Sequence, residues 1–221
     1  MFFSQKSLHF LDENHRRNDR EWFFEHKDEF EKYVRRPMLD LARDLIPTML
    51  DIDPLLNVDP KRAVCRIYRD CRRMTRNKTM FKRALWWVFQ RSKGMTHPVW
   101  FFEFTPDFHH YGCGYYAAPP GVMERIRQLV LAGDKRYLEA RDALDRLPAF
   151  KIDGDFYKRQ RFPDAPEKDR DWLERKSVTA LHYSEDTRRL FSKNLAAVVA
   201  ESFRKLAPVY AFLMHAHETA N

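Results

Sequence analysis

The sequence contains few cysteines and no long hydrophobic run. It has three cysteines among 221 residues, and none is spaced from another as in a zinc ribbon or a redox motif. An odd number of cysteines without such spacing argues against a disulfide framework, so we expect free thiols in a reducing, cytoplasmic compartment. The longest apolar stretches are 84–89 and 195–200, much shorter than the roughly 20 residues of a membrane-spanning helix. We therefore expect no contact with a membrane.

Several motifs typical of enzymes are also missing. There is no Gly-x-Ser-x-Gly, which argues against a serine hydrolase. There is no His-Glu-x-x-His, and the histidine pairs lack a carboxylate at metal-ligand spacing, so we expect no metal site. Gly112 and Gly114 lack the third glycine of a dinucleotide fingerprint, and Lys78-Thr79 lacks the glycine-rich part of a phosphate loop. The amino terminus lacks the basic and apolar regions of a signal peptide, so none is expected. No motif identifies a reaction or a cofactor.

Positive charge is concentrated in one segment. The chain has 40 Lys and Arg against 32 Asp and Glu, a net charge of +8. Residues 61–83 hold ten of the basic residues and one acid, Asp70, so this segment alone accounts for the excess. A local positive field attracts phosphates, nucleic acids or acidic small molecules. The alternative is a solvated basic face that acids from 12–31 or 164–174 compensate.

Helical spacing of apolar residues predicts helices on both sides of the centre of the chain. Asn18 and Glu21 resemble a capping box, with Asn18 as the N-cap of the following helix. We expect Pro37 to end this helix near Arg36, and a second helical stretch to run as far as Pro47. Further helices are predicted over 120–132, 134–146, 172–177 and 187–213.

The middle of the sequence predicts β-strands. Residues 63–69 alternate between two faces, 85–89 and 99–104 are rich in aromatic and β-branched residues, and 108–116 follows a turn. Strands clustered between blocks of helix give the α+β class, with a central antiparallel β-meander flanked by N-terminal and C-terminal helices. We expect one α+β domain over 1–184 and a helical extension over 185–221 that packs on the same domain.

The basic segment supplies the candidate site. In a strand over 63–69, Arg66, Tyr68 and Asp70 would share one face. Glu103 interrupts an apolar strand, and a buried carboxylate needs a partner, so we expect it to pair with Arg66 or Arg69. Such a pair is either a salt bridge that fixes the register of the sheet or part of a pocket in which guanidinium groups bind an anion. The anion-binding candidates are Arg66, Tyr68, Arg69, Arg72, Lys78 and Lys82, and the pocket candidates are Asp70, Glu103, Tyr115 and Tyr116, of which the two carboxylates are also acid–base candidates.

Five ordered landmarks carry a resemblance to a known family. They are 18–23 (NDREWF), 66–70 (RIYRD) with Arg72, 78–82 (KTMFK), 112–115 (GCGY) and 173–176 (LERK). Over roughly 7–184 the chain resembles the largely bacterial domain of unknown function 2461 family. The resemblance implies a single-domain, cytoplasmic α+β protein, and it implies no established reaction, cofactor or catalytic residue. Two features depart from the family pattern: Met80-Phe81 replaces a Pro-Tyr pair, and no histidine follows the glycine turn.

Three functions are compatible with these residues. The first is binding of an anionic or phosphorylated small ligand at a basic cleft built around Arg66–Lys82, with or without catalysis. The second is a nucleic-acid-binding module, in which the basic segment contacts phosphates while Trp86, Trp87 or Tyr115 stack on bases. The third is a non-catalytic interaction protein whose C-terminal helix docks a partner. The sequence does not specify the ligand or the oligomeric state.

Overall fold

The structure is a computed structural model, and it describes residues 2–70, 79–92 and 96–220. The helices are α1 (Gln5–Arg17), α2 (Arg20–Glu25), α3 (Lys27–Phe30), a π-helical turn (Glu31–Arg35), α4 (Arg36–Ile52), α5 (Pro60–Ala63), α6 (Pro120–Leu131), α7 (Lys135–Asp145), α8 (Glu167–Leu173), a 3-10 helix (Thr187–Phe191) and α9 (Leu195–Glu218). The strands are β1 (Leu85–Phe89), β2 (Val99–Phe104), β3 (His109–Gly114), β4 (Phe150–Asp153) and β5 (Thr179–Ser184).

The strands form one antiparallel sheet in the order β1-β2-β3-β5-β4. The first three strands are a meander, and β5 then pairs with β3, which places β4 at the far edge. Helices precede β1 and follow β5 in the chain. The fold is therefore α+β with a central antiparallel sheet between N-terminal and C-terminal helices, as the sequence predicts.

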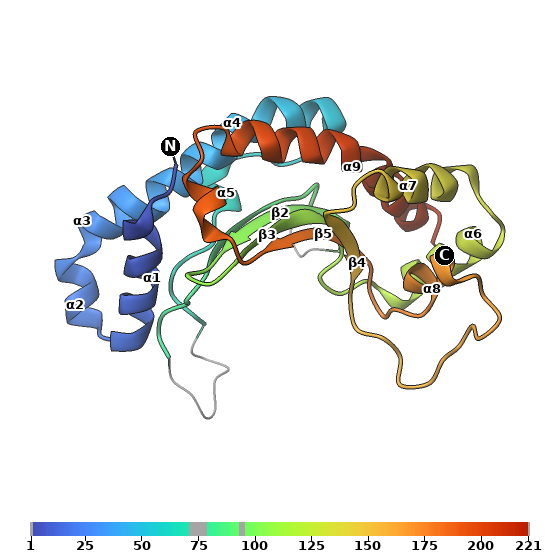
Figure 1. Cartoon of the computed structure of the whole chain (residues 1–221), viewed down its shortest axis with the longest axis horizontal. Helices are drawn as coiled ribbons and strands as arrows, with labels where there is room; N and C mark the ends of the chain where they lie inside the picture. The colour runs from blue at the N-terminus through green and yellow to red at the C-terminus, as the bar shows by residue number, and fades with distance from the viewer. Residues whose placement is uncertain (1, 71–78, 93–95, 221) are drawn as a thin grey trace.

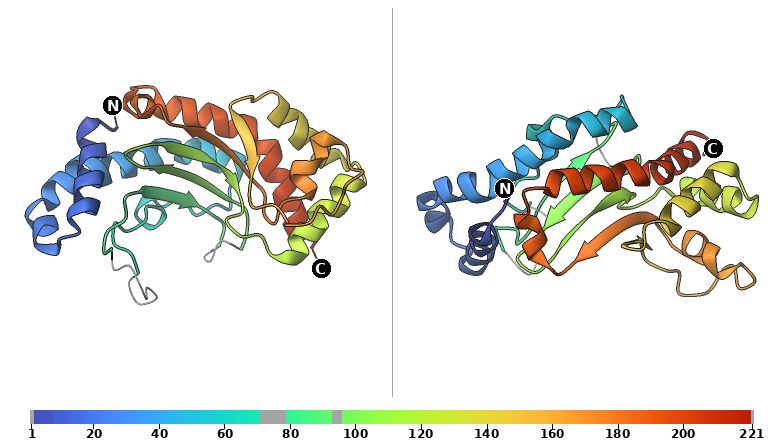
Figure 2. Two further views of the ribbon diagram at one scale, coloured as in Figure 1. Left: turned by 60° about the horizontal axis from the view of Figure 1, so that its bottom comes forward. Right: turned by 45° about the horizontal axis from the view of Figure 1, so that its top comes forward.

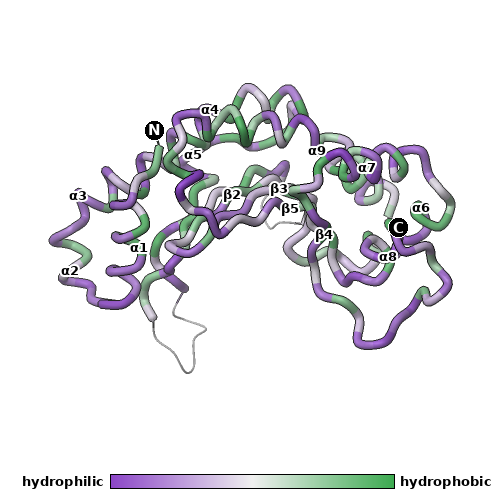
Figure 3. The backbone as a smooth tube through the Cα atoms, in the orientation of Figure 1, coloured by the Kyte–Doolittle hydropathy of each residue, from purple (hydrophilic) through white to green (hydrophobic). Residues whose placement is uncertain are grey.

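The two faces of the sheet differ because side chains alternate along each strand. On one face the side chains are buried against α4 and α9, for example Trp87, Trp100 and Tyr111, whose rings all contact Phe203 of α9. Both helices are amphipathic, and Figure 3 shows hydrophobic and hydrophilic residues alternating along α4. Within the parts of the chain that the structure describes, no helix lies over the opposite face (Figures 1 and 2). We call this opposite side the open face.

Figure 1 shows the molecule as an arch. The sheet, α4 and α9 form its span, while α1–α3 descend at one end and α6 and α8 at the other. The open face lies on the inner side of the arch. Among the described helices, none has both the length and the apolar character needed to cross a bilayer.

A buried carboxylate, Asp53, joins three elements of the span. Asp53, at the end of α4, is 2% exposed. Its carboxylate accepts hydrogen bonds from Arg91 Nε (2.7 Å) and from the Tyr210 hydroxyl of α9 (2.6 Å). These hydrogen bonds outweigh burial and lower the pKa of Asp53. The carboxylate therefore ties α4, the end of β1 and α9 together.

Several helix boundaries differ from the sequence predictions. Asn18 is not an N-cap but the left-handed residue that ends α1 (φ 50°), and its side chain accepts from the Met80 amide (2.6 Å). Asp19 caps α2 instead, and its side chain accepts hydrogen bonds from the amides of Glu21 and Trp22. Pro37 does not end a helix, because it lies in the first turn of α4, where its missing N–H is not needed. Pro47 lies inside α4.

The predicted strand over 63–69 is wrong. The segment begins with the end of α5 and then touches its neighbours through single bridges, Val64 with Trp87 and Tyr68 with Phe81. Two short polar strands, β4 and β5, were not predicted. The helix expected over 172–177 lies earlier, over Glu167–Leu173, and the long helix expected from residue 187 is a 3-10 turn followed by α9.

Candidate functional site

An antiparallel pairing of two chain segments positions the cations of the basic segment. The Arg69 amide donates to the Met80 carbonyl (2.8 Å), and the Lys82 amide donates to the Ile67 carbonyl (2.9 Å). Around the bridge of Tyr68 with Phe81, Arg69 lies opposite Met80 and Lys82 lies opposite Ile67. Side chains of directly opposed residues share a side and those of alternate residues along a strand also share it, so Arg69 and Lys82 leave the pair on the same side. Tyr68 leaves on the other side, where its ring packs edge-on against Phe23. The pairing thus brings together two cations that lie 13 positions apart in the sequence.

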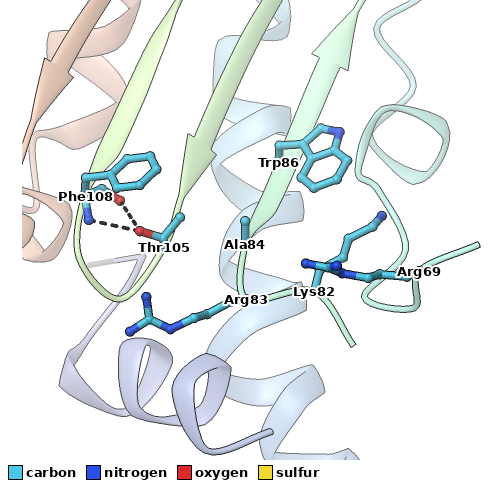
Figure 4. Close-up of a pocket in the computed structure, with 7 residues that line it drawn as sticks. All are labelled: Arg69, Lys82, Arg83, Ala84, Trp86, Thr105 and Phe108. Atoms are coloured by element: carbon cyan, nitrogen blue, oxygen red, sulfur yellow. Dashed lines mark hydrogen bonds between the residues drawn. The ribbon is translucent and has the colours of Figure 1, made fainter. Parts of the chain in front are cut away.

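These cations line a pocket of about 330 Å³, which we call the basic pocket. It lies where β1 begins and where β2 turns into β3, at one end of the open face. Figure 4 shows the Phe108 ring and Thr105 on one side, Trp86 and Lys82 on the other, and Arg83 at the base. The residues around it are Arg69, Lys82, Arg83, Ala84, Trp86, Thr105 and Phe108.

Arg83 is held by two carboxylates. It donates from Nε to Asp12 of α1 (2.8 Å) and forms a two-pronged contact with Asp107 in the β2–β3 turn. The contact with Asp107, and then that with Asp12, raises the pKa of Arg83, while Arg83 lowers the pKa of Asp107. Two acids therefore offset part of the positive charge, and Arg83 fixes the pocket wall while Arg69 and Lys82 remain the candidate anion ligands.

Lys82 and Phe108 are both positioned by backbone contacts. Lys82 Nζ donates to the Arg66 carbonyl (2.6 Å) and lies 4.2 Å from the centre of the Trp86 ring. A cation over an indole face is stabilised by the ring's negative face. The Thr105 hydroxyl accepts from the Phe108 amide (3.0 Å), which holds the turn that carries the Phe108 ring. The pocket therefore combines ammonium and guanidinium donors with two aromatic walls.

Beside the pocket, four side chains lie in one row across the open face. Trp86 of β1 pairs in register with Glu103 of β2, Glu103 with His110 of β3, and His110 with Tyr183 of β5. We call this set the open-face row. His110 Nε2 lies 3.3 Å from Glu103 Oε2, and both side chains are about a quarter exposed, at 24% and 27%. The expected pairing of Glu103 with Arg66 or Arg69 is wrong, because the register of β2 and β3 places His110 opposite the carboxylate. An imidazole held by a carboxylate can accept or donate a proton.

The other predicted site residues are dispersed. Arg66 and Asp70 are exposed, and Tyr68 points away from the basic pocket. Tyr115 and Tyr116 follow the opposite end of β3 from the pocket; Tyr115 is buried and Tyr116 is 87% exposed. Arg72 and Lys78 lie outside the described residues. The sequence analysis selected neither His110 nor Phe108, and it considered Trp86 only as a ring that could stack on bases. The sequence signal for Trp86 and His110 is their position on alternate residues of strands, and Phe108 directly precedes β3.

Cys65 lies near the pocket, and its thiol is not reactive at neutral pH. Burial raises the pKa of Cys65 to about 11, and its Sγ accepts from the Trp86 amide (3.4 Å), so the thiol is protonated at neutral pH. Over the described ranges, no three His, Cys, Asp or Glu side chains gather as metal ligands would. The functional groups that line the pocket are cations, aromatic rings and one hydroxyl.

A second pocket, of about 590 Å³, lies among α1–α3 and was not predicted. Its lining carries both charges, because Glu13 and Glu29 lie beside Lys6 and Arg17, whereas no acid lines the basic pocket among the described residues. Lys6 and Lys32 lower the pKa of Tyr33. This balance of charge makes it a weaker candidate for an anion site than the basic pocket.

Comparison with known proteins identifies a family. A family model described as "Conserved hypothetical protein (DUF2461)" matches residues 6–212. The match includes the basic pocket, the open-face row and most of α9. It therefore extends past residue 184, the predicted end of the family's domain. No curated protein matches the chain. Because the match covers most of its length, the chain belongs to the DUF2461 family.

Proposed function

We propose that the protein binds a small phosphorylated or otherwise anionic ligand in the basic pocket. The observation that carries the proposal is the convergence of Arg69 and Lys82 on one side of a pocket of about 330 Å³ that Trp86 and Phe108 wall. Guanidinium and ammonium groups form charge-assisted hydrogen bonds with phosphate oxygens. The aromatic walls lower the local dielectric constant and strengthen those bonds.

The proposal favours a small anion over a nucleic acid. Asp12 and Asp107 bind Arg83 at the base of the pocket, so among the described residues the pocket carries the charge for one phosphate group. A protein that follows a polyanion neutralises many phosphates, and its affinity then falls steeply with salt. We place this activity in the cytoplasm, in keeping with the free thiols of Cys65 and Cys113.

Calorimetric titration with inorganic phosphate and with ribose 5-phosphate at constant ionic strength tests the proposal. We expect Lys82→Gln and Arg69→Gln each to weaken binding about tenfold or more, as expected for loss of a charged hydrogen bond. Lys135→Gln is the matched control, because Lys135 is 89% exposed on α7, away from the pocket. Equal affinities in Lys82→Gln and Lys135→Gln would reject this pocket as the site.

A further inference from the structure

The basic pocket opens onto a continuous group of exposed and half-buried rings. Phe108 lines the pocket and its ring centre lies 5.2 Å from that of Tyr183 and 5.5 Å from that of His110. His110 in turn lies 5.4 Å from Phe101. Tyr183 is 50% exposed. These four rings, which we call the ring cluster, come from β2, the β2–β3 turn, β3 and β5, and all belong to the open face.

The ring cluster on the open face is a candidate binding surface. Contiguous exposed apolar surface is costly in water and commonly marks a binding site. On the other face of the same sheet, α4 and α9 cover the aromatic side chains, whereas none of the helices in the described ranges covers the ring cluster. The cluster is joined to the pocket through Phe108, so one ligand can contact both.

The charges of the open face restrict what that ligand is. Lys82 and Arg69 attract an anion at the pocket, whereas the Glu103 carboxylate lies one strand further along the row from Trp86 and repels one. The anionic group is therefore confined to the pocket. The part of the ligand that lies beyond Trp86 must be uncharged, flat enough to contact the rings, and able to donate hydrogen bonds to Glu103.

The dimensions agree with a nucleotide. Trp86 and His110 lie on strands separated by two strand spacings, about 10 Å. This is close to the distance between the phosphate and the base of a nucleoside monophosphate. Nucleobases are planar, stack on aromatic side chains, and present amino groups that a carboxylate accepts.

We propose that the ligand is a nucleoside monophosphate, with its phosphate in the basic pocket and its base on the ring cluster beside Glu103. This inference rests on the proposed function, because it requires the same pocket to hold the phosphate. Tyr183 and His110 provide the surface for the base, and Glu103 accepts hydrogen bonds from its edge. A single strand of nucleic acid is the competing occupant, and Glu103 disfavours it because its backbone would have to pass the carboxylate.

Titration of the full chain with AMP, ribose 5-phosphate and a short oligoadenylate separates these cases. We expect AMP to bind about tenfold more tightly than ribose 5-phosphate, since stacking of one base contributes a factor of about 5 to 150. Tyr183→Ala should remove most of this advantage while leaving the affinity for ribose 5-phosphate unchanged, and Tyr183→Phe should retain it. Tyr116→Ala is the matched control, because it removes a more exposed tyrosine from the opposite end of β3.

Each outcome distinguishes the two proposals. If ribose 5-phosphate binds and AMP binds no more tightly, the pocket holds an anion but the nucleotide inference is wrong. If neither binds, the proposed function itself is wrong. Tighter binding of the oligoadenylate than of AMP, with a steep dependence on salt, would overturn the inference in favour of nucleic acid. A Tyr116→Ala variant that loses as much affinity as Tyr183→Ala would also overturn the placement of the base.

Discussion

A buried histidine makes the stability of the fold sensitive to mild acid. His109, the first residue of β3, is 2% exposed and packs near His182 of β5, with ring centres 5.9 Å apart. Burial, reinforced by the positive charge of His182 when protonated and of Arg189, lowers the pKa of His109 from 6.5 to about 4, although Asp186 opposes the shift. Among the described residues, nothing bonds the Nδ1 of His109. The ring is therefore uncharged in the folded protein at neutral pH.

The size of the effect follows from the two pKa values. Between pH 6.5 and about 4 the unfolded chain takes up a proton at His109 that the folded protein does not. The free energy of unfolding therefore falls as the pH is lowered through this window. His109 alone removes about 2 kcal/mol at pH 5 and about 3 kcal/mol once the pH is below 4. The pKa of His182 is also lowered, chiefly by burial, and adds a contribution of the same sign.

Denaturant unfolding at pH 7 and pH 5 measures this contribution. The side chain that His109→Leu introduces cannot titrate. Between pH 7 and pH 5 we therefore expect the free energy of unfolding of this variant to fall by about 2 kcal/mol less than that of the unmodified protein. His9→Leu is the control, because His9 is exposed on α1. An unchanged pH dependence in His109→Leu, or a His109 resonance that titrates near pH 6.5 in the folded protein, would refute the reasoning.

Three further substitutions test the packing of the arch. Asp53→Ala should cost about 3–5 kcal/mol in chemical unfolding, because it leaves the Arg91 guanidinium without its buried carboxylate; a loss below 1 kcal/mol would argue against the pair. Gly112→Ala should cost about 3 kcal/mol or more, because the added Cβ would lie 2.0 Å from the Ala180 carbonyl oxygen on the neighbouring strand. A Cβ added at Gly133 would have no heavy atom within 4 Å, but the residue has φ +63°. Gly133→Ala should therefore cost about 1–2 kcal/mol, and its melting temperature should fall by less than that of Gly112→Ala.

The sequence predicted those elements whose signal is local. β1 and β2 are dense in aromatic and β-branched residues, and Asp134 caps α7 through its bond to the Arg136 amide (2.9 Å), as its place before a helical pattern indicates. β4 was missed because it has only four residues, and β5 because most of its residues are polar. β5 is a strand because β3 offers it an edge, and β4 because β5 then offers the next one, which is a property of the assembled sheet.

The strand predicted over 63–69 failed for the opposite reason. Its alternation of polar and apolar residues is real, but α5 ends at Ala63 and only single bridges at Val64 and Tyr68 follow. An alternation of polar and apolar residues indicates that successive side chains lie in two different environments. In this segment one environment is the protein core and the other is solvent, although the backbone is a loop. Ile67 is buried, so the period-two pattern reflects burial in this segment although no ladder forms.

The candidate site was predicted in part. The sequence identified the positive segment, and Arg69 and Lys82 do line one pocket. It could not reveal that Asp12 and Asp107, from other parts of the chain, would bind Arg83. Nor could it reveal that His110 would lie opposite Glu103, because cross-strand neighbours depend on where the turn between β2 and β3 falls.

Helix α9 connects the span of the arch to one of its ends. It packs on α4 and β3 in the span and on α6 and α7 at that end, so one helix contacts regions that are distant in sequence. Separating that end from the span would break the contacts of α9 on one side or the other. The span and that end should therefore unfold as one cooperative unit, and the amide protons in the middle turns of α9 should exchange with solvent only when that unit unfolds.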